Sequence, residues 1–146
     1  MPTRTAHTAW EGTLEDGSGE VQLASSGAGT FEVSFPRRSA EDAGGVTSPE
    51  ELIAAAHTSC YAMQMSALLA KHGATPGTLA VSADVELGPD TEGFKISAIH
   101  LTVAGTAQGI DAEGFRRVAE EAKRTCPVSK ALAGVGEITV DVAFDA

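Results

Sequence analysis

The order of hydrophobic patterns along the chain predicts an α+β fold. Short segments of β-strand character come in runs that helical segments separate, in the order three strands, helix, two strands, helix, one strand. Because the strands do not alternate strictly with helices, this order favours α+β over a doubly wound sheet. The chain has 146 residues, enough to bury a core unaided, so we expect a single domain over residues 1–146.

The first third of the chain predicts three short strands. They are expected at residues 7–14, 20–24 and 31–35, and glycine-rich turns join them. Trp10, in the first strand, is expected to be a core or dimer-contact aromatic rather than a platform for a substrate. A charged, glycine-containing loop is expected at residues 36–46.

The first helix has its own start and stop signals. Ser48 suits the N-cap, Pro49 the first helical position and Glu51 the third position. Together they form a capping box with negative charge at the positive end of the helix dipole. The pattern ends at Lys71, because a His-Gly pair follows it.

Residues 52–70 of this helix contain no Asp, Glu, Lys or Arg. A stretch of this length approaches the ~20 residues that a membrane-spanning helix needs. It is rich in alanine, however, and carries polar side chains that lipid would penalise and a protein interior can satisfy. We therefore expect a central, buried helix rather than a membrane span.

The second half of the chain predicts two strands, an amphipathic helix and a last strand. Apolar and polar residues alternate at residues 79–87 and again at 138–144, as in half-buried strands. At residues 94–104 apolar side chains fall on both faces, so this strand is expected to be bulged or covered twice. The helix between them begins after Asp111 and presents one apolar stripe, made of Phe115, Val118, Ala119 and Ala122.

The composition favours a globular cytoplasmic protein. Hydrophobic residues make up 42% and charged residues 21% of the chain, which excludes a disordered segment. A net charge of −10 disfavours nucleic-acid and anionic-membrane partners. The first residues lack the apolar core of a signal peptide. In the cytoplasm two cysteines do not form a permanent structural disulfide by default, so both become candidates for chemistry.

Cys60 lies deep inside the first helix. Its neighbours at helical spacing include Ile53, Ala56 and Met63, a mostly apolar wall. Burial would raise the pKa of the thiol, so Cys60 needs a nearby cation to become a useful thiolate. Without one it would be an inert core cysteine, and the adjacent Tyr61 is expected to be a packing residue.

Cys126 is expected at a junction between two helices. Because it precedes Pro127, its backbone is disfavoured in the helical region, so the second helix should end there. Pro127 suits the first position of a new short helix. Cys126 would then lie at a helix N-terminus, where the dipole favours a thiolate.

Three segments resemble a known family. Residues 47–60, TSPEELIAAAHTSC, resemble the first-cysteine helix of the OsmC/Ohr superfamily of osmotically inducible and organic hydroperoxide resistance proteins. Residues 126–129, CPVS, resemble its second-cysteine motif, and residues 6–12, AHTAWEG, resemble the first strand of the OsmC branch. The order of the elements agrees as well, so the resemblance covers essentially the whole chain.

The resemblance implies an OsmC-like fold, an intertwined homodimer with two central helices, and the reduction of alkyl or fatty-acid hydroperoxides. The first cysteine of the family matches Cys60, which would attack the peroxide and become a sulfenic acid. The resolving cysteine matches Cys126, which would close a disulfide with Cys60, and the active-site glutamate matches Glu50. No resident cofactor or metal is implied, and the resemblance suggests that an external dithiol of the lipoyl type would restore both thiols.

The arginine that would activate the thiolate differs between branches of the family. The turn at residues 16–19 holds no arginine where the Ohr branch carries one. The OsmC branch places it around the third strand, where this chain has Arg37 and Arg38. Neighbouring side chains alternate in direction, so only one of the two can point inward. Arg38 is favoured, and Arg37 stays open.

Glu50 and Cys60 cannot meet within one chain if both lie on one straight helix. Their spacing in the sequence separates them by ~15 Å along the axis and by roughly 80° around it. If both serve one thiolate, we expect Glu50 to come from the partner subunit.

Three other functions remain open. Cys60 and His57 could form half of a zinc site, although His7, His72 and His100 lie in unrelated elements. Cys60 could be the nucleophile of a Cys–His hydrolase, although His57 is poorly placed as its base and more plausibly packs or forms a hydrogen bond. The third alternative is a non-enzymatic dimer that senses redox state or binds small apolar ligands.

Overall fold

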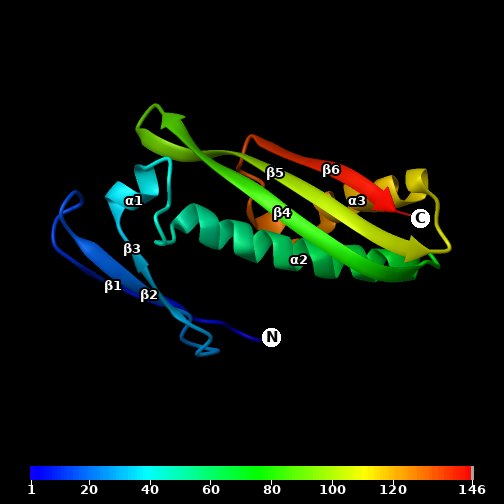
Figure 1. Ribbon diagram of the computed structural model, residues 1–146, viewed down its shortest axis with the longest axis horizontal. Coiled ribbons are helices and arrows are strands. Elements are labelled where there is room, and N and C mark those ends of the chain that lie inside the picture. Colours follow the sequence, from blue (N-terminus) through cyan, green and yellow to red (C-terminus); the bar gives the residue numbers. More distant parts are fainter. Residues whose placement is uncertain (146) are drawn as a thin grey trace. The chain divides into compact units, whose positions relative to one another are not determined.

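The computed structural model describes residues 1–145 and confirms the α+β class (Figure 1). Strands come in runs of three, two and one, and helices separate the runs as the sequence predicts. The elements in chain order are β1 (His7–Glu11), β2 (Ser18–Gln22), β3 (Thr30–Val33), α1 (Phe35–Ser39), α2 (Pro49–Lys71), β4 (Thr75–Asp90), β5 (Gly93–Gln108), α3 (Ala112–Thr125), α4 (Pro127–Ala131) and β6 (Glu137–Asp145).

The chain divides into two compact units. The first is Met1–Leu52 and the second begins at Ile53, so the division falls just after the first turn of α2. None of the helices in the described residues combines the length and the apolar character needed to cross a membrane.

The first unit contains an antiparallel sheet with β2 between β1 and β3. All three strands are shorter than the sequence pattern predicts or are shifted along it. β1 ends at Glu11 because Gly12 takes a φ of 96°, a left-handed conformation that turns the chain out of the strand.

Helix α1 corrects the expectation of a loop that begins directly after β3. The Ser34 hydroxyl accepts a hydrogen bond from the Arg37 N–H at 3.4 Å, and Pro36 occupies the first turn. A side-chain cap and a proline in the first turn are sufficient to start a short helix. As a result Arg37 and Arg38 lie on a helix and not in an irregular loop.

The second unit contains the sheet β4-β5-β6. β4 and β5 form an antiparallel hairpin, and β6 returns parallel to β5 after a crossover made by α3 and α4. Register shifts interrupt the hairpin, and one of them leaves Ser97 of β5 opposite no residue of β4. This β-bulge confirms the irregularity expected where apolar residues fall on both faces.

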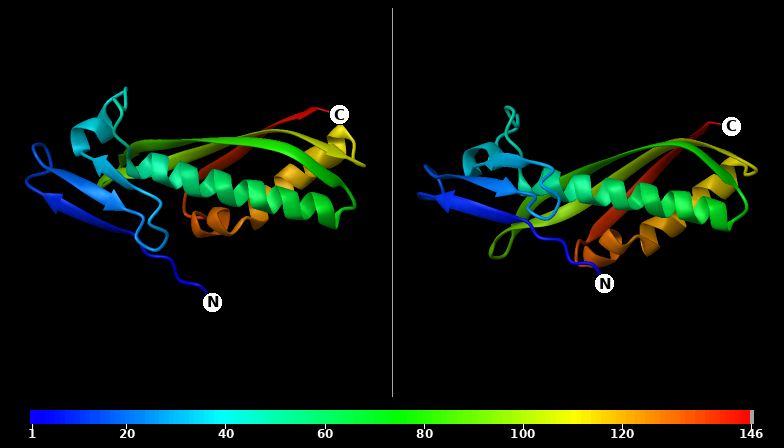
Figure 2. Two further views of the ribbon diagram at one scale, coloured as in Figure 1. Left: turned by 60° about the horizontal axis from the view of Figure 1, so that its bottom comes forward. Right: turned by 90° about the horizontal axis from the view of Figure 1, so that it is seen from below.

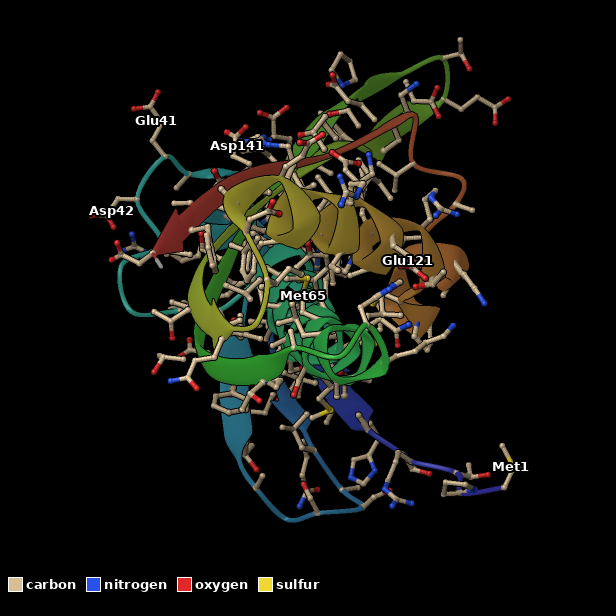
Figure 3. The ribbon with its side chains drawn as sticks, turned by 90° about the vertical axis from the view of Figure 1, so that its right-hand side faces the viewer. Met1, Glu41, Asp42, Met65, Glu121 and Asp141 are labelled. Carbon is tan, nitrogen blue, oxygen red and sulfur yellow. The ribbon has the colours of Figure 1, made fainter. Side chains whose placement is uncertain are left out.

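Helices α2 and α3 lie on the same face of this sheet (Figures 1 and 2). Side chains of β5 alternate, and the buried set points toward the helices. The core between the sheet and the helices contains Tyr61, Met65, Leu68, Leu69, Ile99, Leu101, Val103, Phe115, Val118, Ala119 and Ala122. In Figure 3, Met65 lies in this interior, and Asp141 lies on the outer side of the sheet.

Helix α2 begins as predicted but is buried on one face only. The Ser48 hydroxyl accepts the Glu51 N–H at 3.1 Å, which confirms the N-cap. The expected burial of the whole helix is wrong for the single chain, because an opposite face is exposed and Met63 is 72% exposed. That face carries small and neutral residues in place of charges, which is why the sequence did not distinguish it from the core-facing side.

Candidate active site

The two cysteines meet between α2 and the junction of α3 with α4. Their Sγ atoms are 3.1 Å apart, and both thiols are free. Cys126 is fully buried, and Cys60 is partly exposed. A disulfide bond is about 2.0 Å long, so closing the pair requires the two sulfurs to approach by only about 1 Å.

The junction has the backbone predicted from Cys126 and Pro127. Cys126 adopts φ −57° and ψ 126°, outside the helical region, and it is both the last cap of α3 and the first cap of α4. Pro127 imposes this break and then starts α4. The thiol of Cys126 is thereby turned from the end of one helix toward Cys60 on another.

The pKa of Cys60 is raised above its ordinary value. Burial is the main cause, and a hydrogen bond with the Cys126 thiol acts in the same direction. The backbone N–H of Val128, in the first turn of α4, forms a hydrogen bond to the sulfur that favours the thiolate and partly offsets the rise. Within its own unit Cys60 is therefore a thiol at neutral pH, and it needs an added cation to become a nucleophile.

Two hydrogen bonds flank the cysteine pair. One joins His57 Nε2 to Ser129 Oγ at 2.7 Å, and in the other Gln64 Nε2 donates to Thr125 Oγ1 at 2.9 Å. His57 is fully buried, its Nδ1 has no partner among residues 1–145, and burial lowers its pKa. The expectation that His57 packs or forms a hydrogen bond is confirmed.

Arg38 and Glu50 form an ion pair in the first unit. Arg38 Nη2 lies 2.8 Å from Glu50 Oε1, and Arg38 Nε donates to the same carboxylate at 3.0 and 3.2 Å. Glu50 is 8% exposed, so the carboxylate is held where solvent screens it little. Arg37 is exposed, and its guanidinium lies against Gly44. The structure thus brings Cys60 to Cys126 in one unit and Arg38 to Glu50 in the other.

An apolar pocket of about 400 Å³ lies beside Arg38 within the first unit. Trp10, Leu14 and Phe35 are among the side chains that line it. Trp10 is 44% exposed, so it is not a core residue of the single chain, and the alternative expectation of a dimer contact stays a prediction. No local sequence pattern predicts this pocket, because its walls come from strands, a turn and helices that are far apart in the chain.

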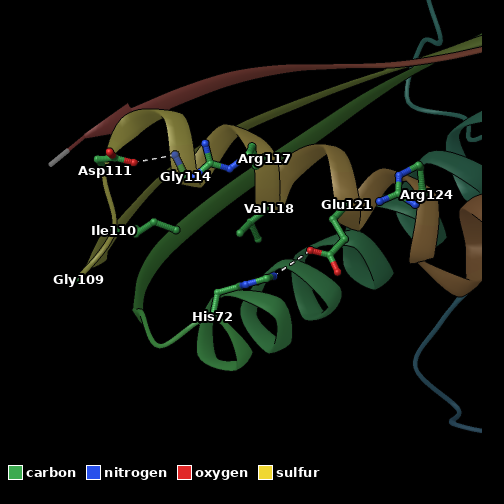
Figure 4. Close-up of a pocket in the computed structure, with 9 residues that line it drawn as sticks. All are labelled: His72, Gly109, Ile110, Asp111, Gly114, Arg117, Val118, Glu121 and Arg124. Atoms are coloured by element: carbon green, nitrogen blue, oxygen red, sulfur yellow. Dashed lines mark hydrogen bonds and ion pairs between the residues drawn. The ribbon is translucent and has the colours of Figure 1, made fainter.

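A larger cleft of about 930 Å³ lies between the end of α2 and α3 (Figure 4). His72 points across it to Glu121, with 2.9 Å between Nε2 and Oε2, and Arg117 and Arg124 line the same side. Its lining contains neither cysteine. Ion pairs without a nucleophile make it a weaker candidate for catalysis than the cysteine pair.

The described residues contain no group of three or more His, Cys, Asp or Glu side chains arranged to hold a metal ion. His57 directs Nε2 to Ser129, so this ring nitrogen is already engaged. What the paired thiols can do chemically is to exchange between dithiol and disulfide, with Cys60 as the sulfur that outside molecules can reach.

Comparison with known proteins gives the family. Residues 42–142 match the family model described as OsmC-like protein. The chain is 39% identical over 132 residues to peroxiredoxin OsmC of Escherichia coli, covering 90% of each chain. It is 28% identical over 143 residues to an organic hydroperoxide resistance protein of Xanthomonas axonopodis, covering 97% of this chain and 98% of the relative. The chain belongs to the OsmC-like family.

Solved structures support the same fold. The organic hydroperoxide resistance protein OhrB of Bacillus subtilis superimposes with a TM-score of 0.66 at 23% identity, covering 97% of this chain and 98% of that chain. An OsmC-like protein of Mycoplasma pneumoniae gives a TM-score of 0.73 at 13% identity and covers 99% of both chains. At these identities the comparison concerns the fold alone, and it confirms the OsmC-like fold that the resemblance implied.

Proposed function

We propose that this protein is a thiol-dependent peroxidase that reduces organic hydroperoxides, with Cys60 as the nucleophile and Cys126 as the resolving thiol. The observation that carries the proposal is the 3.1 Å approach of the two sulfur atoms. Cys60 is partly exposed and Cys126 is buried, which suits attack on an outside oxidant followed by internal resolution. The relatives named peroxiredoxin and organic hydroperoxide resistance protein support the same assignment.

The proposed cycle has three steps. The Cys60 thiolate attacks the outer peroxide oxygen, the O–O bond breaks, and the departing alkoxide takes up a proton to become the alcohol. Cys60 is then a sulfenic acid, and the Cys126 thiol attacks its sulfur to form a disulfide and release water. An external dithiol, which we propose to be of the lipoyl type, reduces the disulfide by exchange and is itself oxidised. The cycle uses no resident cofactor or metal.

Arg38 is the cation that we propose for the Cys60 thiolate. Its guanidinium keeps its charge at every accessible pH, and the two-oxygen contact with Glu50 fixes its orientation. Such a fixed charge would counter the raised pKa of Cys60 and polarise the peroxide. Because helix geometry separates Glu50 from Cys60 by ~15 Å within one α2, we propose that the Arg38–Glu50 pair comes from the partner subunit.

The homodimer is therefore part of the proposal. Helix α2 has an uncovered face of small and apolar residues in the single chain, with Met63 near its middle. A second copy that packs along this face would bury it and bring two α2 helices together at the centre. We propose that residues 1–146 form one OsmC-like domain that acts as such a dimer in the cytoplasm.

The apolar pocket beside Arg38 supports an organic hydroperoxide as substrate. An alkyl or fatty-acid chain gains free energy from burial against Trp10, Leu14 and Phe35, whereas hydrogen peroxide has no apolar surface to bury. Of the apolar wall expected from Ile53, Ala56 and Met63, both Ala56 and Met63 are exposed in the single chain.

The test is the intact mass of the reduced protein before and after one equivalent of an organic hydroperoxide. We expect loss of two hydrogens, a Cys60–Cys126 bridge in the peptide map, and recovery of both thiols with dithiol. Cys60→Ser should abolish peroxide consumption, and Cys126→Ser should stop at a sulfenic acid that a dimedone-type reagent traps. Wild-type protein that leaves the hydroperoxide unconsumed would refute the peroxidase and favour a non-enzymatic dimer that binds apolar ligands or senses redox state.

A further inference from the structure

Among the described residues, the cysteine pair is the middle one of three polar side-chain contacts between α2 and the α3–α4 junction. Going along α2, the contacts are His57 with Ser129, Cys60 with Cys126, and Gln64 with Thr125. Residue numbers rise on α2 and fall on the junction, so the two segments run in opposite directions. A hydrogen bond therefore lies on each side of the two sulfurs.

The junction packs against the core through Cys126, Val128 and Leu132, but it contains no long helix that would fix its position. Cys126 leaves helical geometry, and α4 has only five residues, far fewer than the length at which a helix is stable alone. No side-chain hydrogen bond caps α4. Ser129 is 6% exposed and, together with the bond from the Val128 N–H to the Cys60 sulfur, ties α4 to α2.

Packing alone does not explain the residue types at these contacts. A buried imidazole and a buried hydroxyl cost more than an apolar pair of the same volume unless they bond to each other. Thr125 forms a second hydrogen bond within its own helix. Its hydroxyl donates to the Glu121 carbonyl at 2.8 Å while its oxygen accepts from Gln64. Directional bonds fix the position of a backbone segment more sharply than apolar contacts do.

We propose that the His57–Ser129 and Gln64–Thr125 hydrogen bonds form a clasp that positions Cys126 for the resolving step. This inference rests on the proposed function. The clasp accelerates the reaction of the Cys60 sulfenic acid with the Cys126 thiol, which gives the disulfide and water. It thereby limits the competing reaction, in which a second hydroperoxide oxidises the sulfenic acid to a sulfinic acid and is itself reduced to the alcohol. The four clasp residues are positioning residues and do not touch the peroxide.

The first experiment measures the disulfide without any peroxide. In a glutathione buffer, two protein thiols and one glutathione disulfide exchange with the protein disulfide and two glutathione thiols, and the equilibrium constant reports how well Cys126 is held against Cys60. We expect Ser129→Ala and Thr125→Val each to lower this constant up to about tenfold, as for loss of a hydrogen bond that is buried in the first case and partly buried in the second. Ser129→Thr, which keeps the hydroxyl, should recover most of it.

Tyr61→Phe is the matched control. The Tyr61 hydroxyl is buried and donates to the Ala119 carbonyl at 2.8 Å, so its loss removes a comparable hydrogen bond between α2 and the body of α3. We expect this variant to lose as much thermal stability as Ser129→Ala and to keep the wild-type equilibrium constant. An equal fall of the constant in Tyr61→Phe would refute the clasp and leave general stability as the cause.

The second experiment measures how much of the oxidised Cys60 becomes the disulfide and how much becomes sulfinic acid. Intact mass after rising doses of an organic hydroperoxide separates the disulfide, which has lost two hydrogens, from the sulfinic acid, which has gained two oxygens. We expect Ser129→Ala and Thr125→Val to form sulfinic acid at about tenfold lower hydroperoxide doses than wild type. When either substitution is added to Cys126→Ser, dimedone-trapped sulfenic acid should form at the same rate as in Cys126→Ser alone. Wild-type partition in both variants would refute the clasp.

The two proposals fail in different ways. If wild-type protein does not react with hydroperoxide but the glutathione constant falls in the two variants, the peroxidase is wrong and the clasp stands as a feature of the redox pair. If wild type reacts and neither readout changes in the variants, the peroxidase stands and the clasp is wrong. Should Ser129→Ala not fold, Thr125→Val and Ser129→Thr still give both measurements.

Discussion

At the scale of single residues, Cys60 lies beside a second thiol in surroundings that disfavour its thiolate. Burial and the neighbouring Cys126 thiol both raise its pKa, and only the Val128 N–H opposes them. A peroxide reacts with the thiolate, so the protein must supply positive charge from elsewhere. Arg38 is held in the required way, by a carboxylate that fixes the guanidinium and is itself almost fully buried.

The neighbouring arginines give a test with an internal control. Arg38→Ala should lower kcat/KM for an organic hydroperoxide by about 10²- to 10³-fold, as for loss of a preorganised electrostatic contact. Arg37→Ala removes the same charge one residue away, where the side chain is exposed, and should stay within about twofold of wild type. Arg38→Lys should recover only part of the activity, because an ammonium cannot make the two-oxygen contact with Glu50.

Steady-state turnover with a fixed dithiol gives these values, and alkylation rates of Cys60 against pH report its thiolate directly. In Arg38→Ala the alkylation curve should shift to higher pH. If Arg37→Ala were the slower variant, the assignment of the two arginines would be reversed.

His57 gives a pH dependence of stability whose sign follows from its burial. Burial lowers the pKa of His57 below its ordinary value of 6.5 in the folded chain. Between the two pKa values the unfolded state binds a proton that the folded state does not, so stability falls as pH falls below 6.5 and is fully present above it. His57→Gln cannot titrate, so its free energy of unfolding should decrease less than that of wild type between about pH 7.5 and about pH 5.5.

Urea denaturation at a series of pH values measures this difference. The other histidines are unchanged in the variant, so their contributions cancel when the two slopes are compared. If the free energy of unfolding depended on pH equally in wild type and His57→Gln, His57 would not be the group whose pKa is lowered in the folded chain.

At the scale of the elements, α3 offers a stability test remote from the chemistry. The Asp111 carboxylate caps the helix by accepting the Gly114 N–H at 2.8 Å. Asp111→Ala should lower the free energy of unfolding by about 1 kcal/mol. Glu113→Ala, two residues later, removes an exposed ion pair with Arg117 and an exposed charge in the first turn, and should change it by less than about 0.5 kcal/mol.

Urea denaturation measures both variants, and the glutathione equilibrium of the cysteine pair should be the same in both as in wild type. The cap is at the N-terminal end of α3, whereas Cys126 lies at its C-terminal end. Equal effects of the two substitutions would mean that the Asp111 side chain contributes only charge near the helix dipole.

The elements that could be predicted from sequence are those with a strong local pattern. Alternation in β4 and β6 and the apolar stripe of α3 each depend on one face being polar. Helix α1 was missed because its only local signals are Ser34 and Pro36 over five residues. The exposed side of α2 was missed because neutral small residues look the same whether another part of the chain or a second copy covers them.

In the candidate site, too, only the features that depend on local sequence could be predicted. Cys126 beside Pro127, and the helix around Cys60, were sufficient to predict both positions from local backbone rules. The flanking hydrogen bonds were not predicted, because each joins residues more than sixty positions apart. In the sequence, His57 lies three residues before Cys60, and Ser129 lies three residues after Cys126. This equal spacing predicts a contact only when the antiparallel pairing of the two segments is known.

At the scale of the whole molecule, the residues of the proposed site belong to two different units of the chain. The thiols belong to the second unit and the Arg38–Glu50 pair to the first. In the proposed dimer each chain supplies the nucleophile of one site and the cation of the other. Activity should then depend on association, whereas the pairing of Cys60 with Cys126 should not.

Met63 is the residue at which to test this dependence. It is 72% exposed on the uncovered face of α2, and Met63→Lys would place a charge in the middle of the proposed helix–helix contact, where it would lie unpaired in an apolar interface. We expect the variant to be monomeric by analytical ultracentrifugation at micromolar concentration and to lose at least about 10²-fold in kcat/KM, since the Arg38 of the partner is removed together with the partner. Its glutathione equilibrium should match that of wild type, because the cysteine pair lies within one chain.

Thr102→Lys adds the same charge at an exposed position of β5, opposite Asp141 of β6, and should remain dimeric and active. A fully active Met63→Lys monomer would mean that one chain contains the complete site, and Arg38 would then have to reach Cys60 of its own chain.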